Sequence, residues 1–283
     1  MASENMNKSG AFLPAAIVTA ICALGLFLRL ILSPVEGYGF DIGVNQGWAK
    51  SAVQLGLAKS YSEQVDGNML PNYPPLSLMV FASTGHLYQF FVSPEYDKSR
   101  VENRVFIKFP SILADIITVV LLFLIVAKWR GRKAGYIAAA VYALHPAVIY
   151  DSAVWGQTDS LYTMFLVACL GALSMQWNAA AGALIALAFL TKTQAIILIP
   201  LVGFVLLLRG WKATGKAATA AVVSAVIIVL PFIPDNGLQG IAKMYMDSIG
   251  YYPTVASNAY NFWWALLSDS ANSTTDNQLI FGV

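Results

Sequence analysis

Residues 134–177 read AGYIAAAVYALHPAVIY, DSAVWGQTDS and LYTMFLVACLGALSMQW in turn, so that two apolar runs flank a polar stretch at 151–160. As helices, the two runs approach the thickness of a bilayer core. Carboxylates and amides are costly at the edge of a membrane, and they are usually kept there for function. The pattern predicts membrane helices with a polar site at the end where they meet.

The composition of the whole chain agrees with a membrane protein. Of the 283 residues, 58% are hydrophobic and 11% are charged, and the mean hydropathy is +0.63. A soluble domain would carry about 25% charged residues. We therefore expect an all-α polytopic membrane protein. No basic patch interleaves with aromatic residues, which argues against nucleic-acid partners. Cys22 and Cys169 lie in apolar segments, which argues against a disulfide framework.

The apolar runs predict about seven membrane spans and the start of another. The first span is expected at Ala11–Leu32, and the polar interval after it contains a shorter apolar stretch at Leu76–Val92. The remaining expected spans are Val105–Ala127, Ala134–Tyr150, Leu161–Trp177, a double-length run Ala179–Leu208 that is interrupted at 191–194, and Ala217–Pro234, followed by a helix start at Gln278–Val283.

Two basic loops orient these spans. They lie at 128–133 and 209–216, and loops rich in lysine and arginine stay on the cytoplasmic side. Between them the chain must then cross the membrane an even number of times. Ala179–Leu208 is therefore expected to be a hairpin of two short helices that meet near Lys192 on the outer side.

The short helices predict that Lys192 is recessed. A helix over Ala179–Thr191 would rise about 20 Å, less than the hydrocarbon core of about 30 Å. Lys192 would then lie below the outer surface, within protein or in a wet cavity. The same parity argument makes Leu76–Val92 a juxtamembrane helix, inside a first extracytoplasmic loop at 33–104.

This topology gathers the polar candidates on the outer face. They are Asp41, the turn Asn72–Pro75, the stretch 151–159, Lys192, Gln194 and the aromatic region 251–253. The cytoplasmic side keeps mainly basic loops. Carboxylates, a cation and aromatic residues on one face are what an outward-facing active site requires.

Several of these residues stand in recognisable motifs. The motifs are Phe40-Asp41, PNYPPL (71–76), KFPSILAD (108–115), HPAVIYDSAVWGQTDS (145–160), LTKTQ (190–194) and NAYNFW (258–263). Together they resemble the bacterial membrane mannosyltransferases that are related to the GPI-anchor mannosyltransferases, within the GT-C superfamily of membrane glycosyltransferases. The resemblance covers most of the chain, and block 145–160 is its most specific part.

The resemblance implies a GT-C-type helical bundle whose first outer loop carries juxtamembrane helices. It implies an enzyme that transfers a hexose, by default mannose, from a polyprenyl-phosphate-sugar donor to an acceptor hydroxyl, with inversion. The expected location is a bacterial plasma membrane with the active site on the outer face. The expected partners are the lipid-linked donor, membrane lipids and a glycan, lipid or protein acceptor. The family runs longer, so residues 1–283 are expected to be a single transmembrane module that is truncated at the C-terminus.

Asp41 is the candidate catalytic residue. An acceptor hydroxyl must lose its proton as it attacks the anomeric carbon, which requires a carboxylate within hydrogen-bond reach. The resemblance puts this general-base role on Asp41. The structural alternative is that Asp41 only caps the N-terminus of an amphipathic helix from Ile42 to about Leu57.

Lys192 is the candidate partner of the leaving lipid phosphate, because a cation offsets the charge that develops there. The alternative is a lysine that snorkels from a helix end to the membrane surface. Arg104 and Lys108, at the outer end of the second span, could share the phosphate or could only anchor the helix at the interface.

The other site candidates are assigned to the substrate. Gln157, Asp159 and Asp151 could bind sugar hydroxyls or orient a catalytic residue, and Asp151 could instead cap a helix. Trp155 could stack on a sugar or belong to an interfacial belt of aromatic residues. Tyr73 and Gln194 lie on the same outer face and complete the substrate-binding set.

The remaining polar residues have structural interpretations. Asp115 lies inside its span, so we expect an interhelical hydrogen bond. His86 and His145 have no metal-ligand spacing around them, and no D-x-D pair or nucleotide-binding glycine loop occurs. The sequence therefore predicts no metal and no cofactor besides the lipid-linked donor.

Two other classes of function stay open. A secondary transporter would also place a lysine in a broken helix, although it usually carries paired breaks in two halves, and only one break is evident. An inactive scaffold subunit is the third interpretation. The identities of the sugar and the acceptor are not encoded in any motif.

Overall fold

The computed structural model describes residues 2–248, 254–256 and 261–275. Most of these residues are helical, and the described residues contain no strand, only one isolated bridge between Thr254 and Thr275. The prediction of an all-α protein is confirmed. The predicted helix start at Gln278–Val283 and the aromatic region 251–253 lie outside the described residues.

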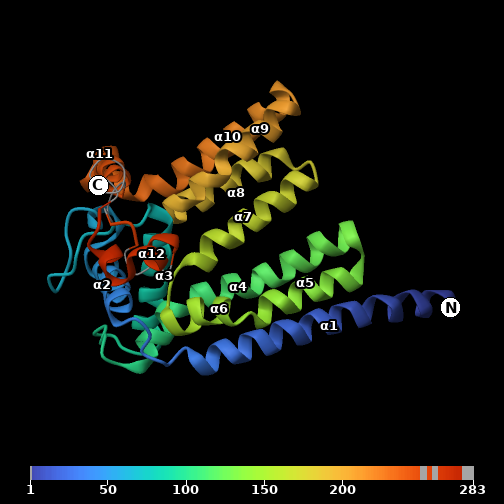
Figure 1. Ribbon diagram of the computed structural model, residues 1–283, viewed down its shortest axis with the longest axis horizontal. Coiled ribbons are helices and arrows are strands. Elements are labelled where there is room, and N and C mark those ends of the chain that lie inside the picture. Colours follow the sequence, from blue (N-terminus) through green and yellow to red (C-terminus); the bar gives the residue numbers. More distant parts are fainter. Residues whose placement is uncertain (1, 249–253, 257–260, 276–283) are drawn as a thin grey trace.

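Figure 1 shows two parts, a bundle of helices that lie side by side and a group of elements at one end of it. The bundle contains α1 (Ala2–Leu32), α4 (Val101–Arg130), α5 (Arg132–Leu144), α7 (Asp159–Ser174), α8 (Asn178–Thr191), α9 (Ile199–Leu208) and α10 (Trp211–Val229). The end group contains α2 (Gly39–Leu55), α3 (Pro75–Phe91), α11 (Ile233–Asp247) and α12 (Phe262–Leu267), with the short turns Leu57–Lys59, Leu230–Phe232 and Ser268–Asn272.

Among the described residues, three helical stretches are long and apolar enough to cross a membrane. They are Ala15–Leu32, Val101–Arg130 and Trp211–Asp235. A fourth candidate is the pair Arg132–Leu144 and Pro146–Trp155, which is bent by 48° at its break. Asp159–Ser174, Asn178–Thr191 and Thr193–Leu208 are apolar but shorter. The chain is a membrane protein, and the number of spans stays a prediction.

The break predicted near Lys192 is present. Helix α8 ends at Thr191, Lys192 is extended with φ −151° and ψ 134°, and a 3-10 turn, Thr193–Leu198, leads into α9. The chain reverses here, and the connections α4–α5, α7–α8 and α9–α10 all lie at the end that faces the N-terminus in Figure 1. Both basic loops therefore share one end, as the parity argument requires. The side of the membrane on which they lie stays a prediction.

The bend at His145 begins the polar stretch. His145 precedes Pro146, which disfavours the helical conformation, and it is extended with ψ 120°. Its Nδ1 accepts a hydrogen bond of 3.3 Å from the backbone N–H of Ala147, so this histidine caps the short helix α6 (Pro146–Ile149). The chain then forms a π-helix over Tyr150–Trp155. This helix ends at its C-cap residue Gly156, which has the left-handed backbone conformation.

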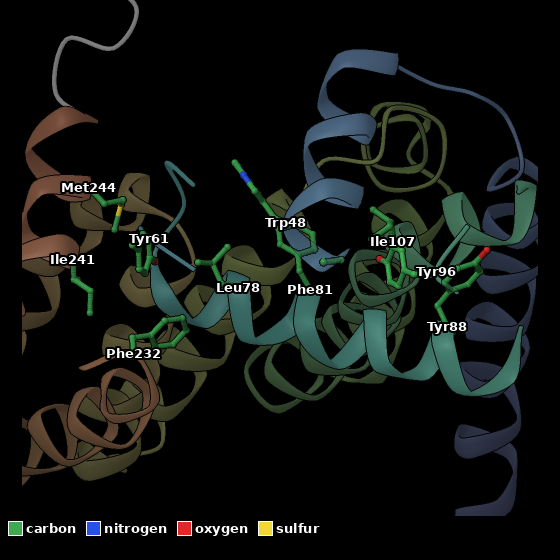
Figure 2. Close-up of a cluster of buried hydrophobic side chains, with 11 residues drawn as sticks. Trp48, Tyr61, Leu78, Phe81, Tyr88, Tyr96, Ile107, Phe232, Ile241 and Met244 are labelled. Carbon is green, nitrogen blue, oxygen red and sulfur yellow. The ribbon is translucent and has the colours of Figure 1, made fainter. Parts of the chain in front are cut away.

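The end group is held by a cluster of large apolar side chains. It contains Trp48, Ala49, Tyr61, Leu78, Phe81, Tyr88, Tyr96, Ile107, Phe232, Ile241 and Met244, all buried. Figure 2 shows these side chains distributed along α3, between α2 and the C-terminal helices. Aromatic pairs such as Trp48 and Phe81, whose ring centroids lie 6.0 Å apart, stabilise the cluster beyond the burial of their apolar surface. The juxtamembrane helix predicted at Leu76–Val92 is α3, and its packing fixes α2 at the end of the bundle.

The long helices α1, α4 and α5 are tied by a buried polar network. The Nε of Arg29 donates to Oδ2 of Asp115 at 2.9 Å, and the hydroxyl of Tyr142 donates to Oδ1 at 2.9 Å. Arg29 also donates to the carbonyls of Gly25 and Ala143, at 3.0 and 2.8 Å. Arg29 and Asp115 are both 0% exposed. The prediction that Asp115 makes an interhelical hydrogen bond is confirmed.

A glycine sets the distance between α8 and α10. A Cβ on Gly182 would lie 2.0 Å from the carbonyl oxygen of Ala217, so Gly182→Ala forces the two helices apart. Overpacking of this kind costs about 1–3 kcal/mol. We expect a thermal unfolding temperature in detergent that is several degrees lower. Gly203→Ala is the matched control, because a Cβ there meets no atom within 4 Å. Equal unfolding temperatures for the two variants would contradict the close approach.

Candidate active site

The carboxylate of Asp41 faces the end of the polar stretch. Asp41 lies in the first turn of α2, which begins at Gly39. Its Oδ2 accepts hydrogen bonds from Nε1 of Trp155 at 2.9 Å and from Nε2 of Gln157 at 2.5 Å. The N-cap position belongs to Tyr38, whose side chain makes no capping bond. Asp41 is therefore not the cap of a helix that starts at Ile42, and its side chain is directed to residues 155–157.

Two glycines with positive φ allow the two segments to meet. A Cβ on Gly37 (φ 70°) would lie 2.1 Å from the carbonyl oxygen of Val154, and one on Gly156 (φ 87°) would lie 2.3 Å from Cδ1 of Ile42. Only glycine adopts such backbone angles without strain and leaves this space free. The chain before α2 is thereby packed against the end of the π-helix, and the residue after the π-helix is packed against the first turn of α2.

Gln157 links Asp41 to Tyr73. While its amide nitrogen donates to Asp41, its Oε1 accepts from the hydroxyl of Tyr73 at 3.3 Å. Its backbone carbonyl accepts from Oγ of Ser111 at 2.8 Å. The two side-chain bonds orient the amide, with its nitrogen directed at the carboxylate, while the bond from Ser111 holds the backbone of the same residue.

Lys192 lies next to Tyr73, at the break between α8 and α9. It is 8% exposed and forms an ion pair with Oδ1 of Asp159. Its Nζ lies 5.4 Å from the ring centroid of Tyr73 and 5.9 Å from that of Tyr162, distances at which a cation is attracted to an aromatic face. The ammonium is held inside the protein by a carboxylate and two rings, and it does not reach to a membrane surface as a snorkelling lysine would.

Asp151 lies near this ion pair. Its backbone carbonyl accepts from the N–H groups of Gly156 and Gln157, at 3.0 Å each, which closes the π-helical turn. Its carboxylate makes no hydrogen bond or ion pair with any described residue, and it interacts electrostatically with Asp159 and Lys192. The side chain does not cap a helix, and its predicted role in binding the substrate is not tested by these contacts.

Three other candidates lie apart from these contacts. Gln194 is exposed and its Oε1 accepts from the hydroxyl of Thr193 at 3.2 Å. Arg104 places Nη1 3.4 Å from the carbonyl oxygen of Pro34. Lys108 is 0% exposed and donates to the carbonyls of Ser33 and Val35, so it neither reaches a phosphate nor anchors α4 at an interface. The roles of Gln194 and Arg104 stay predictions.

Sequence reasoning missed Tyr162 and Ser111. Tyr162 follows Asp159 by three residues on α7, so the two lie on one helix face, and this spacing could have revealed it. Ser111 contacts Gln157 from α4, 46 residues away, and no local pattern indicates that contact. Within the described part of the chain, no three histidine, cysteine or acidic side chains lie close enough together to hold a metal ion.

An apolar cavity lies between α3 and α4. Its volume is about 690 Å³, and its walls come from α3 and α4 with Leu30 of α1. It begins at Leu76, two residues past Pro74, and Oγ of the next residue, Ser77, donates to the carbonyl of Thr191 at 2.7 Å. One lining residue, Leu76, is thus the sequence neighbour of a residue that contacts the end of α8, while none of Asp41, Tyr73 and Lys192 lines the cavity.

Part of the chain matches a known family. Residues 100–234, from the residue before α4 to the start of α11, match the family described as dolichyl-phosphate-mannose-protein mannosyltransferase. The match includes the polar stretch 151–160, Lys108 and Lys192. No curated protein matches the chain. The resemblance to GT-C membrane glycosyltransferases is confirmed over this segment.

Proposed function

We propose that the protein transfers a hexose from a polyprenyl-phosphate-sugar donor to an acceptor hydroxyl. The match of residues 100–234 to the dolichyl-phosphate-mannose-protein mannosyltransferase family supports this, because that family implies a glycosyltransferase of the membrane. Mannose is the proposed sugar, and the proposed site faces the non-cytoplasmic side. The substitution at the anomeric carbon proceeds with inversion, since one carboxylate is proposed to act as base and none as nucleophile.

The position of Asp41 is the observation that carries the proposal. Trp155 and Gln157 both donate to its Oδ2, and among the described residues no hydrogen bond is made to Oδ1. The free oxygen can accept the proton of an acceptor hydroxyl while the two donors hold the carboxylate still. As the acceptor oxygen bonds to the anomeric carbon, its proton passes to Asp41 and the bond to the lipid phosphate breaks.

Lys192 is the proposed partner of the leaving phosphate. An ammonium has three donors, and the pair with Asp159 uses one of them. Two remain for phosphate oxygens, so donor binding need not expel Asp159. The charge that develops on the leaving phosphate would lie near a cation that is already desolvated, which strengthens the attraction.

The apolar cavity supports a lipid-linked donor. Its lining side chains, such as Met79, Val80 and Phe109, offer the surface that an isoprenoid chain requires. We propose that a donor with its phosphate at Lys192 extends its chain along α3 into this cavity, whose lining includes Leu76 near the start of that helix. A nucleotide-linked sugar would leave this surface unused.

Direct transfer tests the proposal. Purified protein in lipid vesicles is supplied with radiolabelled polyprenyl-phosphate mannose and a mixture of glycan, lipid and peptide acceptors. Transfer of label from this donor, and not from a nucleotide-linked mannose, is the expected result. Sealed vesicles that accumulate a free sugar without any transfer product would favour a transporter and would refute the proposal.

Lys192→Met should weaken the use of the donor. Methionine keeps much of the length and apolar packing of the side chain but has no charge for the phosphate. Charge-assisted hydrogen bonds contribute about 1.5–3 kcal/mol each, so we expect a fall in kcat/KM for the lipid-linked donor of at least tenfold. Lys59→Met is the matched control, because Lys59 is exposed and pairs only with Glu63. A normal kcat/KM in Lys192→Met would remove this residue from the phosphate site.

A further inference from the structure

Lys108 is a fully buried cation without a counter-ion. It is 0% exposed, and none of the ion pairs among the described residues includes it. Its Nζ donates to the carbonyl oxygens of Ser33 and Val35, at 3.0 and 2.6 Å. Burying a charged group costs free energy unless hydrogen bonds compensate it. The two hydrogen bonds to backbone carbonyls therefore stabilise Lys108 in its buried position.

The two carbonyls mark the point where the chain leaves α1. The backbone N–H of Ser33 still bonds to the carbonyl of Arg29, and that of Val35 to Leu32, the last residue of α1. The last carbonyls of a helix lack partners within the helix and carry partial negative charge. An ammonium at this place therefore fixes the direction of the segment that leads to Asp41.

That segment is also contacted by Arg104 at Pro34 and by Trp155, whose ring centroid lies 5.9 Å from that of Tyr38, but its backbone is intrinsically flexible. It contains Gly37 and Gly39 before Asp41, and glycine restricts the backbone least of all residues. No atom lies within 4 Å of a Cβ built on Gly39. The hydrogen bonds from Lys108 at residues 33 and 35 restrict the start of this segment, and so they restrict the position of Asp41 at its end.

The stem of the same lysine fills the space beside Gly156, on the other side of the site. A Cβ on Gly156 would lie 3.3 Å from Cε and Cγ of Lys108, and Gly156 separates Trp155 from Gln157, the two donors to Asp41. Ser111, three residues further along α4, donates to the carbonyl of Gln157. One turn of α4 thus contacts both segments that form the site.

We propose that Lys108 is a positioning residue that sets the placement of Asp41 against Trp155 and Gln157. It acts through the carbonyls of residues 33 and 35 on one side and through Gly156 on the other, and it touches no substrate. The inference rests on the proposed function only in treating Asp41 as the general base. The hydrogen bonds that hold segment 33–41 to α4 do not depend on which reaction the protein catalyses.

Lys108→Met tests this role because it keeps the stem under Gly156 and removes the donor. A misplacement of about 1 Å costs roughly 10²-fold in rate, so we expect kcat to fall by about 10–100-fold while the KM for the lipid-linked donor changes less than about threefold. Hydrogen–deuterium exchange should rise at residues 33–41 and stay unchanged in α8 and α10. Lys108→Arg, which keeps a donor, should recover part of kcat and of the protection.

Each outcome of the experiment decides one question. A wild-type kcat and wild-type hydrogen–deuterium exchange in Lys108→Met would overturn the inference. If Asp41→Asn loses transfer activity in the same set of measurements, the proposed function is still supported. A rise of exchange throughout the bundle would also overturn it, since Lys108 would then be a residue of general stability. If the wild-type protein transfers no sugar but the local rise at 33–41 occurs, the fastening holds and the proposed function fails.

Discussion

Asp41→Asn is expected to reduce the rate of glycosyl transfer by about 10²–10⁴-fold, the usual contribution of a general base. The asparagine oxygen can still accept hydrogen bonds from Trp155 and Gln157, which both reach the same atom of Asp41. The shape of the site should therefore survive while the basic oxygen is lost. Initial rates with polyprenyl-phosphate mannose measure the effect, and the KM for the donor should change little.

The matched control for this variant is Asp66→Asn. Asp66 lies in the chain between α2 and α3, where hydrogen bonds from Lys50 and Lys98 lower the pKa of its carboxyl group. It makes no contact with Trp155 or Gln157, so its loss should leave the rate unchanged. If both variants transfer sugar at the wild-type rate, Asp41 is not the base, and the resemblance that assigned it this role is misleading at that residue.

Arg29→Met is expected to cause the largest loss of stability. It leaves the carboxylate of Asp115 buried with only the hydroxyl of Tyr142 as partner. Removing one member of a buried ion pair costs about 3–5 kcal/mol, because the remaining charge stays desolvated. Unfolding in mixed micelles with increasing denaturing detergent should show a large decrease in the free energy of unfolding.

The double variant Arg29→Met, Asp115→Leu separates charge burial from packing. Replacing a whole buried pair by apolar side chains is often nearly neutral, so the double variant should be more stable than Arg29→Met alone. A double variant that is as unstable as the single one would mean that the loss comes from packing or from the carbonyls of Gly25 and Ala143, and that the ion pair contributes little.

Much of the helical architecture could be predicted from patterns within single segments. Hydrophobic runs predicted the helices, and the position of the two basic loops predicted the break at Lys192, which the structure contains. Hydrophobic runs and the charge of a loop are properties of single segments, so both can be recognised in the sequence without knowledge of the fold. The start of α2 was placed three residues too late, because Gly39 and Phe40 carry no recognisable cap.

The candidate site was predicted less completely. Asp41, Tyr73, Gln157, Asp159 and Lys192 are brought together as the shared outer face suggested. The environment of each residue could not be predicted. Lys108 resembled a surface lysine at a helix end, and its burial depends on carbonyls that lie 73 and 75 residues away in the sequence.

Arg29 illustrates the same limit in the core. Near the end of a predicted span, an arginine is usually interpreted as an interfacial anchor. Its partner, Asp115, lies on another helix 86 residues away, so only the folded bundle reveals that the two charges compensate each other. Pairing between distant helices is the information that periodicity and loop charge do not contain.

Because of the π-helical turn at Tyr150–Trp155, the geometry of the site depends on the number of residues in the polar stretch. A π-turn holds more residues than an α-turn, so it behaves as an insertion that rotates everything after it. Here it is followed by left-handed Gly156, and together they direct Trp155 and Gln157 to one carboxylate. A chain one residue shorter in this turn could retain all of the site's side chains and still direct its tryptophan away from Asp41. Counting residues between His145 and Gln157 is therefore as informative about function as reading their identities.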